Sequence, residues 1–565
     1  MDDGSTSGSA RLAELGERYF ATQHGYDPLN ATLLGLAEFD HLVGDPSREA
    51  GAAAADAFAR IAEELSGIDP SGLDEADQVD HQVLTVLNRG AEGDARHALW
   101  AANASAKGYV SRQGLLFQAV PAMTTTGADG GDRYLSRLAA AGGMLAALGQ
   151  RYLVEARDGR VPTARGVRHA VEQLEGYLAL PLEQDALLKP TEADPSGPVR
   201  ARALALVDRS VRPAMAALAV LLRTELLPVS RADDRVGIRF VPGGGQGYQA
   251  ALARHTTTDL TAEEIHQIGL DALAELAPRW SELGQRALQE SDFTALAARL
   301  RSDRSLRFEN RQQIVDVAQA ALDRAQAVQD RWFPDHGISD CVIEEINPLE
   351  AANAALAYYR PPAVDGSRPG AHCLLTTEPE QRFRYEYECL AFHESVPGHH
   401  LQLATAQLLD IPRYRRYLDV EACSFNEGWG LYSEQLADEI GLYSSDVDRL
   451  GMLSHAALRA CRLVVDTGIH HQGWSREQAV EFMWRHTATT EANVRNEIDR
   501  YIAWPGQAVS YLIGKREILR LREQARDALG DRFTPLGFHE AVLANGAVPL
   551  PVLGMQVARW QARAA

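Results

Sequence analysis

The sequence predicts a mainly α-helical protein with one small β element, and three observations support this fold class. From Ala10 to about Leu226 the chain is rich in Ala, Leu, Glu and Arg, and apolar residues recur at three and four positions. Residues 380–530 return to the same long helical patterns. Between these parts lie two short β-leaning stretches, 341–346 and 372–377, which could pair as a small sheet.

Breaks and caps mark the ends of individual helices. Helices cannot continue through the turn-forming stretches 69–72 and 189–197, where Pro and Gly interrupt the pattern. Further along, Thr261 and Glu264 stand three residues apart, which is the spacing of a capping box. We therefore expect a helix to begin there and to continue through about Leu288.

The domain boundary is expected where the pattern changes. Residues 236–241 alternate in polarity like a strand, and a glycine cluster follows them. This change divides the chain into a helical N-terminal region, 10–235, and a second region, 236–565, which we expect to pack together as one unit.

Length and charge limit the class of protein. With 565 residues, 45% hydrophobic and 24% charged, the chain suits either several globular modules or one large enzyme. The 56 basic and 77 acidic side chains give a net charge of −21, which repels polyanions. Nucleic acid is therefore not expected as a partner, although a local basic pocket could still bind one carboxylate or phosphate.

The cellular location and the state of the cysteines can be predicted from segments and spacings that are absent from the sequence. No apolar run reaches the ~20 residues of a membrane helix, and the first residues are acidic where a signal peptide would be basic. We expect a cytoplasmic protein that does not bind a membrane. The five cysteines are odd in number and have no Cys-x-x-Cys spacing, so we expect buried free thiols rather than disulfides or a thiolate zinc site.

The most informative segment contains His393, Glu394, His399 and His400. In the His-Glu-x-x-His helix of zinc peptidases, two histidines one turn apart bind one zinc ion, and the glutamate beside the first activates a water molecule. Here the spacing is longer. On a regular helix, six residues correspond to ~240° of rotation and ~9 Å of rise, and seven residues to ~10.5 Å, so neither later histidine is well placed.

Pro397 and Gly398 change this expectation, because proline removes a backbone donor and glycine tolerates unusual dihedral angles. The helix must distort between the histidines, which would bring His399 back beside His393. We therefore favour His399 over His400 as the second ligand, and both stay open. The simplest alternative is a pair of surface histidines beside a helix break.

A second segment supplies the missing anion. Glu427 lies in the run Asn-Glu-Gly-Trp-Gly, and a carboxylate from a following helix would complete a set of three protein ligands. Otherwise, Glu427 would be a solvated carboxylate at the start of a helix. Glu434 lies seven residues further, on the same helical face, and could accept a hydrogen bond from a ligand histidine.

Two further segments offer candidates for substrate binding. Arg459, Arg462, Asp466 and His470 follow each other at steps of three and four, and form one polar stripe on an apolar helix. The stripe is either a solvent face or a cleft wall, where arginine binds a substrate carboxylate and His470 donates to a developing oxyanion.

Tyr501 and Tyr511 also carry hydroxyls that could stabilise the oxyanion, although core packing is the simpler explanation for either one alone.

Four segments resemble the bacterial domain-of-unknown-function family 885: residues 247–257, the run His-Glu-x-x-Pro-Gly-His-His-Leu-Gln, residues 426–429 and residues 501–514. The run around Glu427 also resembles the Asn-Glu-Gly segment of gluzincin aminopeptidases, in which the glutamate binds zinc. The resemblance implies a large, helical, metallopeptidase-like fold, with the metal in a deep cleft and the small β element beside it.

This sequence departs from the expected pattern at two places. Cys373 and Leu374 occupy a strand where substrate-binding backbone is expected, and Gly430 replaces a common alanine.

We expect a cytoplasmic zinc-dependent hydrolase that cleaves an amide bond in a peptide or peptide-like small molecule, with region 236–565 as its catalytic part. The expected roles are zinc ligands (His393, His399, Glu427), water activation and amine protonation (Glu394), oxyanion support (Tyr501, Tyr511 or His470) and substrate binding (Arg459, Arg462). Two alternatives are a biosynthetic tailoring enzyme with the same metal site and a non-catalytic, metal-stabilised binding protein. The sequence leaves open the substrate, exo- or endo-action and the oligomeric state.

Overall fold

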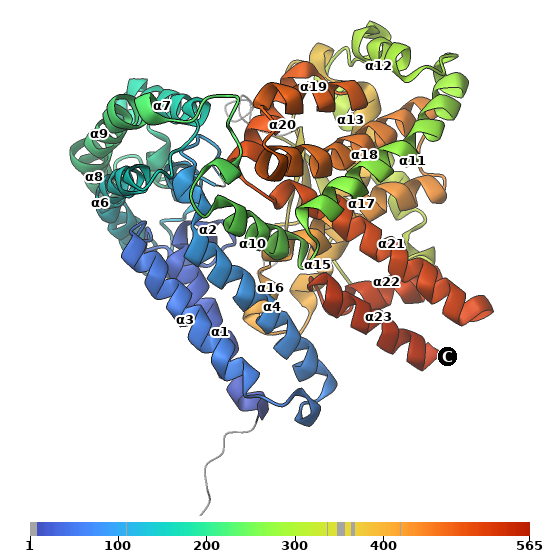
Figure 1. Ribbon diagram of the computed structural model, residues 1–565, viewed down its shortest axis with the longest axis horizontal. Helices are drawn as coiled ribbons and strands as arrows, with labels where there is room; N and C mark the ends of the chain where they lie inside the picture. The colour runs from blue at the N-terminus through green and yellow to red at the C-terminus, as the bar shows by residue number, and fades with distance from the viewer. Residues whose placement is uncertain are drawn as a thin grey trace, which may run out of the picture. The chain divides into compact units, whose positions relative to one another are not determined.

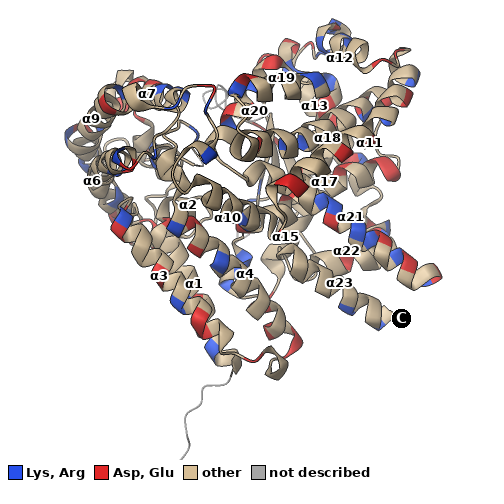
Figure 2. Ribbon diagram, in the orientation of Figure 1, with Lys and Arg blue, Asp and Glu red and all other residues tan. Residues whose placement is uncertain are grey.

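The computed structural model describes residues 8–108, 110–335, 337–346, 356–362, 368–418 and 420–564. It confirms the predicted fold class: helix accounts for 74% of the residues, and one small three-stranded sheet accompanies it (Figure 1). No helix in this described part combines the length and apolar composition needed to cross a membrane. Figure 2 marks the positions of acidic and basic residues, and both kinds occur along the helices of the two units.

The chain forms two compact units. The first contains Met1–Arg254, Gly468–Ala479 and Asn496–Pro505, and the second contains His255–Thr467, Val480–Arg495 and Gly506–Ala565. The boundary expected near Val236 therefore falls inside the first unit, and two later segments return to it. Local sequence patterns do not report such returns, because a returning segment is defined by contacts distant in the chain.

The first unit is built from helices. One of its apolar clusters takes side chains chiefly from α5, α6, α7 and α9. The helices of this unit are α1 (Gly8–Tyr26), α2 (Pro28–Leu33), α3 (Arg48–Ser66), α4 (Glu75–His97), α5 (Arg112–Ala122), α6 (Gly130–Arg157), α7 (Ala164–Ala179), α8 (Pro198–Leu206), α9 (Arg212–Leu221) and α10 (Gly244–Thr256), with the start of α19 (Arg476–His486) and the end of α20 (Glu491–Ala503).

The strand expected at residues 236–241 does not form. Ile238–Phe240 is instead a short 3₁₀ turn, η9. The backbone N–H of Ile238 donates to Nδ1 of His470 at 3.1 Å, so a side chain rather than a neighbouring strand accepts from it. Apolar alternation alone cannot distinguish these two outcomes.

The second unit contains the remaining helices and the sheet. The predicted capping box at Thr261 and Glu264 is confirmed, and it opens a helix that ends at Leu288 as expected. The helices are α11 (Ala262–Leu288), α12 (Phe293–Ser302), α13 (Arg311–Gln326), α14 (Tyr387–Glu394), α15 (His399–Leu408), α16 (Arg413–Arg416), α17 (Cys423–Glu439), α18 (Asp446–Thr467), α21 (Ser510–Leu529), α22 (Pro535–Leu543) and α23 (Leu550–Ala564).

The sheet has the order β1-β3-β2, formed by Cys341–Glu345, Gly370–Leu374 and Ala357–Arg360. β3 pairs in parallel with β1 and antiparallel with β2. The pairing of the two predicted β-leaning stretches is therefore confirmed, and β2 is an additional strand. Because β3 is the central strand, its backbone is paired on both sides and has no free edge for a substrate.

Two glycines let α17 and α21 approach closely beside the expected ligand Glu427. A Cβ atom on Gly428 would lie 2.6 Å from the carbonyl carbon of Gly514, and one on Gly514 would lie 1.6 Å from the carbonyl oxygen of Ser424. Any larger side chain would push the helices apart. The α21 backbone thus fixes the position of the α17 turn that carries Glu427.

Candidate metal centre

The helix that carries the histidines breaks, as the Pro-Gly pair predicts. α14 ends at Glu394 and α15 begins at His399. Between them, Gly398 lies so close to His393 that a Cβ atom would stand 1.8 Å from the His393 carbonyl oxygen. Only glycine fits this fold-back. It brings the His393 and His399 rings together, with centroids 4.7 Å apart and planes at 87°.

His400 points away from this pair. The hydroxyl of Tyr359 donates to its Nδ1 at 3.0 Å, and its Nε2 donates to the carbonyl oxygen of Ser339 at 2.9 Å. Burial lowers the pKa of His400 to about 4, so the ring is neutral near pH 7. Both nitrogens are thus engaged in fastening α15 to β2 and to the chain before β1. The structure brings His399, and not His400, to His393.

Glu427 faces both rings from α17. Its Oε2 lies 3.4 Å from Nε2 of His393 and 3.6 Å from Nε2 of His399, and the three candidate ligand atoms all lie within 4.8 Å of one another. Zinc ligands at ~2.0–2.1 Å in a tetrahedron stand about 3.3–3.5 Å apart. Two imidazole nitrogens and one carboxylate oxygen at these separations fit a zinc ion that keeps one position open.

Two carboxylates interact with the ring of His393. His393 donates from Nδ1 to Oε1 of Glu434 at 2.8 Å, as the seven-residue spacing of the two glutamates suggested. Burial would lower the pKa of His393, but the hydrogen bonds with Glu427 and Glu434 outweigh it and raise that pKa to about 10. Burial likewise opposes ionisation of the glutamates. The Arg459 charge and His393 nevertheless lower the pKa of Glu434 to about 2, and the two histidines hold that of Glu427 well below its usual range.

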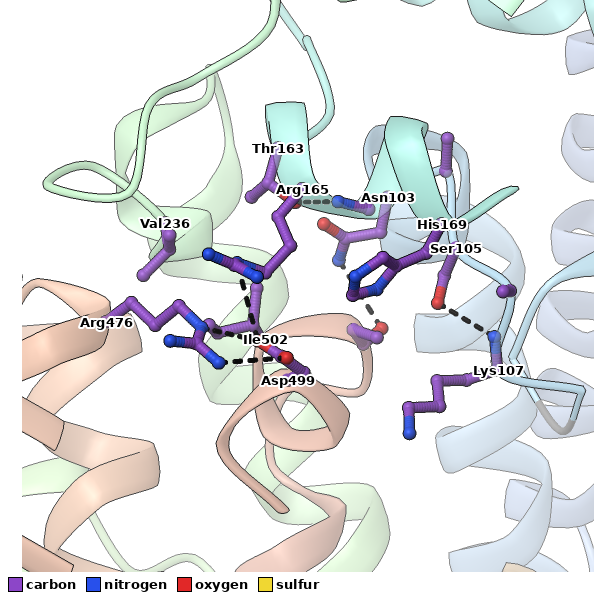
Figure 3. A pocket seen from close by; sticks show the side chains of 14 residues that line it. Asn103, Ser105, Lys107, Thr163, Arg165, His169, Val236, Arg476, Asp499 and Ile502 are labelled. Carbon is purple, nitrogen blue, oxygen red and sulfur yellow. Dashed lines mark hydrogen bonds and ion pairs between the residues drawn. The ribbon is translucent and has the colours of Figure 1, made fainter. Parts of the chain in front are cut away.

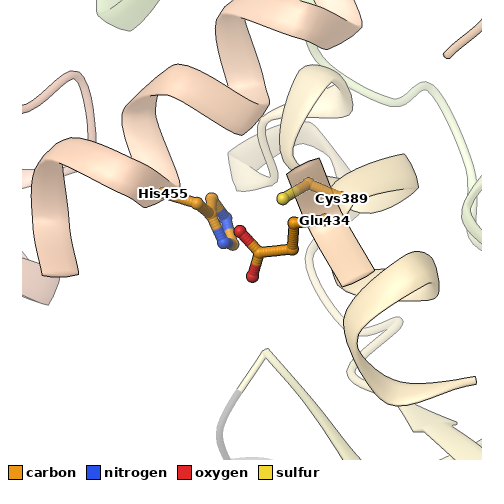
Figure 4. Close-up of side chains that lie close together, drawn as sticks. All are labelled: Cys389, Glu434 and His455. Carbon is orange, nitrogen blue, oxygen red and sulfur yellow. The ribbon is translucent and has the colours of Figure 1, made fainter. Parts of the chain in front are cut away.

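A second group of potential ligands lies behind His393. Cys389, Glu434 and His455 extend toward one another from α14, α17 and α18 (Figure 4). Oε1 of Glu434 already accepts from His393, and an Arg459 nitrogen lies 3.5 Å from it. Burial also raises the pKa of the Cys389 thiol well above its usual range, so the thiol stays protonated. A cation here would meet a guanidinium and no thiolate, so this group supports His393 instead.

Glu394 is the last residue of α14 and is 9% exposed. Within the described part of the chain, no group donates a hydrogen bond to its carboxylate, in contrast to Glu427 and Glu434. Its position next to His393 and its free oxygens suit a proton acceptor at the metal centre.

The polar stripe on α18 is buried, so it is not a solvent face. Arg459 faces Glu434, and Arg462 stacks over the ring of Tyr511 at 4.3 Å. Asp466 accepts from the backbone N–H of Gly506 at 3.1 Å. These contacts tie helices of the second unit together. Arg459 supports the carboxylate behind His393, and substrate binding by Arg462 and oxyanion support by Tyr511 stay predictions.

Tyr501 and His470 belong to the first unit, where their polar groups are engaged. The Tyr501 hydroxyl donates to Glu497 at 2.6 Å. His470 accepts from Ile238 and donates from Nε2 to the carbonyl oxygen of Tyr501 at 3.0 Å. Burial lowers the pKa of His470 to about 3, which keeps it neutral. These contacts give both residues a structural role, and nothing in them supports the expected oxyanion role.

The sequence assigned no role to Gly430 or to His372. Gly430 was noted only as a departure from the common alanine, but a Cβ atom there would lie 2.5–2.8 Å from the His393 ring. The glycine therefore provides the space for the ligand. His372, a buried histidine on β3, carried no signal beyond its residue type in a β-leaning stretch.

A separate cavity lies within the first unit, where Lys107, Arg165, His169 and Arg476 line it (Figure 3). Its arginines are already paired. Arg476 binds Asp499 through two hydrogen bonds of 2.6 and 3.0 Å, and Arg165 binds Asp233 at 2.9 Å. Lys107 donates to the amide oxygen of Asn496. These contacts join segments of the first unit, and Asp499 and Asp233 compensate the charges of the two arginines.

Comparisons with known proteins agree with this fold. The family described as "Bacterial protein of unknown function (DUF885)" matches residues 28–557. The structure is similar to that of a candidate lipoprotein from Colwellia psychrerythraea, with 27% identity, a TM-score of 0.89, and coverage of 99% of this chain and 100% of the other. A candidate lipoprotein of unknown function from Shewanella oneidensis shares the fold, with 19% identity, a TM-score of 0.75, and coverage of 97% and 99%. No curated protein matches the chain significantly.

The two neighbouring histidines should respond differently to truncation. His399→Ala should abolish retention of zinc, because it removes a ligand. His400→Ala should retain most of the zinc but lower the stability by about 1–3 kcal/mol, because two hydrogen bonds are lost. Zinc content and thermal unfolding of the two purified variants measure this. Loss of zinc in His400→Ala with retention in His399→Ala would reverse the assignment.

Gly430→Ala should weaken zinc binding roughly 10–100-fold, the range typical when outer support of a ligand is disturbed, because the new methyl group displaces the His393 ring. A chelator competition titration measures it. Gly143→Ala is a matched control on α6, where a Cβ atom meets nothing within 4 Å. Equal zinc affinity of Gly430→Ala and Gly143→Ala would show that the ring does not depend on this space.

Proposed function

The chain belongs to the bacterial family DUF885, and we propose that it is a zinc-dependent hydrolase that cleaves an amide bond in a peptide or peptide-like small molecule. One observation carries the proposal: His393, His399 and Glu427 place one ligand atom each within 4.8 Å of one another, next to Glu394, whose carboxylate accepts no hydrogen bond from a described residue. This arrangement has the gluzincin pattern of two histidines, a glutamate ligand and a separate base.

The roles of the side chains follow from their positions. A bound zinc ion would polarise a carbonyl oxygen and make a water molecule more acidic. Glu394 accepts the proton of the attacking water and later returns it to the leaving amine. Zinc would replace the proton on Nε2 of His393, and Glu434 would keep the remaining proton on Nδ1. Arg459 compensates the buried charge of Glu434.

Glu394 also favours an enzyme over a metal-stabilised binding protein. Structural zinc sites are closed by four protein ligands, whereas this centre offers three and an adjacent carboxylate that no described residue engages. A tailoring enzyme that acts on a non-peptide substrate would use the same centre, and it is the second candidate.

The cytoplasmic location stays a proposal. The names of the two solved relatives refer to lipoproteins, which favours the cell envelope instead. The net charge of −21 still argues against nucleic acid as a partner.

Purified protein should carry about one zinc ion per chain, because two imidazoles and one carboxylate suit zinc better than magnesium or calcium. Elemental analysis of a preparation made without chelators measures the content. If the folded protein stays free of metal after incubation with zinc, both the metal centre and the proposed chemistry are wrong.

The two glutamates should separate chemistry from metal binding. Glu394→Gln should keep zinc but lose about 10²–10⁴-fold in rate, because the amide cannot accept the proton. Glu427→Gln should weaken zinc binding along with the rate, because a charged ligand is lost. Zinc content and hydrolysis of a substrate selected from a dipeptide library are measured together. Near-full activity of Glu394→Gln at normal zinc occupancy would contradict the water-activating role.

A further inference from the structure

His372 differs from the other buried histidines that the structure describes, because both of its ring nitrogens are unpaired. Its side chain, on β3, is fully buried, and neither ring nitrogen has a hydrogen-bond partner within the described part of the chain. Buried polar groups are nearly always paired, because an unpaired group loses its hydrogen bonds to water and gains none in the protein. A histidine that keeps two free nitrogens in such a place requires an explanation.

The sheet register shows which way His372 faces. Its partners across the sheet are Ile343 on β1 and Tyr359 on β2. Both partners pack against an apolar cluster that contains Ala391 and Phe392 of α14. Directly opposed residues project to the same face of a sheet, so His372 also faces the α14 side.

Two contacts fix how far along α14 His372 lies. At one end of β3, the Tyr387 hydroxyl donates to the carbonyl oxygen of Leu375 at 3.2 Å. At the other end, Gly370 touches His400, where a Cβ atom would lie 2.7 Å from Nδ1. His372 lies between these ends, so it stands opposite the last turn of α14.

Helical spacing from Tyr387 places Leu390, Ala391 and then Glu394 on the side toward the sheet. The carboxylate of Glu394 and the imidazole of His372 therefore approach the same region.

Electrostatics agree with this placement. Burial raises the pKa of Cys341 to about 12, and the charge of Glu394 adds to this shift. Cys341 pairs with Gly370, two residues before His372 on β3, so it projects to the same face of the sheet as His372. Burial, with a contribution from the His393 charge, lowers the pKa of His372 to about 3. Near pH 7 the ring is neutral, with one N–H donor and one acceptor nitrogen.

We propose, resting on the hydrolase function above, that His372 is a catalytic residue that donates a hydrogen bond to the carbonyl oxygen of the scissile amide, opposite Glu394. As the water oxygen bonds to the carbonyl carbon, negative charge develops on the carbonyl oxygen, and one proton of the water passes to Glu394. The C–N bond then breaks, and the same proton goes from Glu394 to the amine. His372 keeps its own proton throughout, and the substrate carbonyl oxygen is the acceptor for its N–H group.

His372→Phe tests the proposal, because phenylalanine fills a similar volume and has no donor. The zinc-loaded variant should keep its metal, unfold at a higher temperature than the wild type, and lose about 10²–10³-fold in kcat, the usual cost of one oxyanion donor. His372→Gln retains an N–H donor and should recover part of the rate. Ile343→Val, on the same sheet face, is the matched control and should keep the wild-type rate. Unchanged kcat and KM in His372→Phe would overturn the proposal.

A second measurement separates this proposal from the hydrolase function. If the zinc-loaded wild type hydrolyses no amide, the function fails, and His372 is judged by the affinity for acetohydroxamate, whose oxygens accept hydrogen bonds. His372→Phe, or His372→Met if the first variant does not fold, should bind it about tenfold more weakly. Equal affinity would show that His372 does not face the metal centre.

Discussion

The imidazole of His393 is held between two carboxylates of one helix, and the geometry of the centre depends on this arrangement. Glu427 and Glu434 are seven residues apart on α17, which places both on one face about two turns apart. One contacts Nε2 and the other accepts from Nδ1, so the ring cannot rotate without losing a charged partner. Gly430, between them, leaves the space that the ring fills. Buried carboxylates need compensation, and Arg459 provides it for Glu434.

The second constraint is the helix break after Glu394. On a continuous helix, His399 would face away from His393. Gly398 folds the chain onto the His393 carbonyl group, and α15 then starts in a new direction with His399 beside the first ligand. The neighbouring histidine is used to fix this direction, because His400 binds Tyr359 of β2 and the carbonyl oxygen of Ser339. The small sheet thus sets the orientation of the second candidate ligand, although none of the three candidates belongs to the sheet.

Sequence reasoning succeeded where the determinants are local. The capping box at Thr261, the break at Pro397 and the shared face of Glu427 and Glu434 each depend on residues within two helical turns, and the structure contains all of them. It was insufficient where contacts are distant. His470 and Tyr501 bind each other across thirty-one positions, and no periodicity reveals that their polar groups are engaged. The same limit applies to the segments that return to the first unit.

His372 differs in its hydrogen bonding from the other buried groups around it. His470 and His372 are both buried, and burial lowers the pKa of each to about 3, but only His470 has partners for both nitrogens. The groups that hold the centre, such as Glu434 and His393, are paired in the same way. A protein gains stability by pairing or replacing a free buried polar group, so keeping His372 unpaired within the described residues opposes stability. Such a cost is expected at a site whose partners arrive with the substrate, because a group already satisfied in the free enzyme has nothing left to offer the reacting bond.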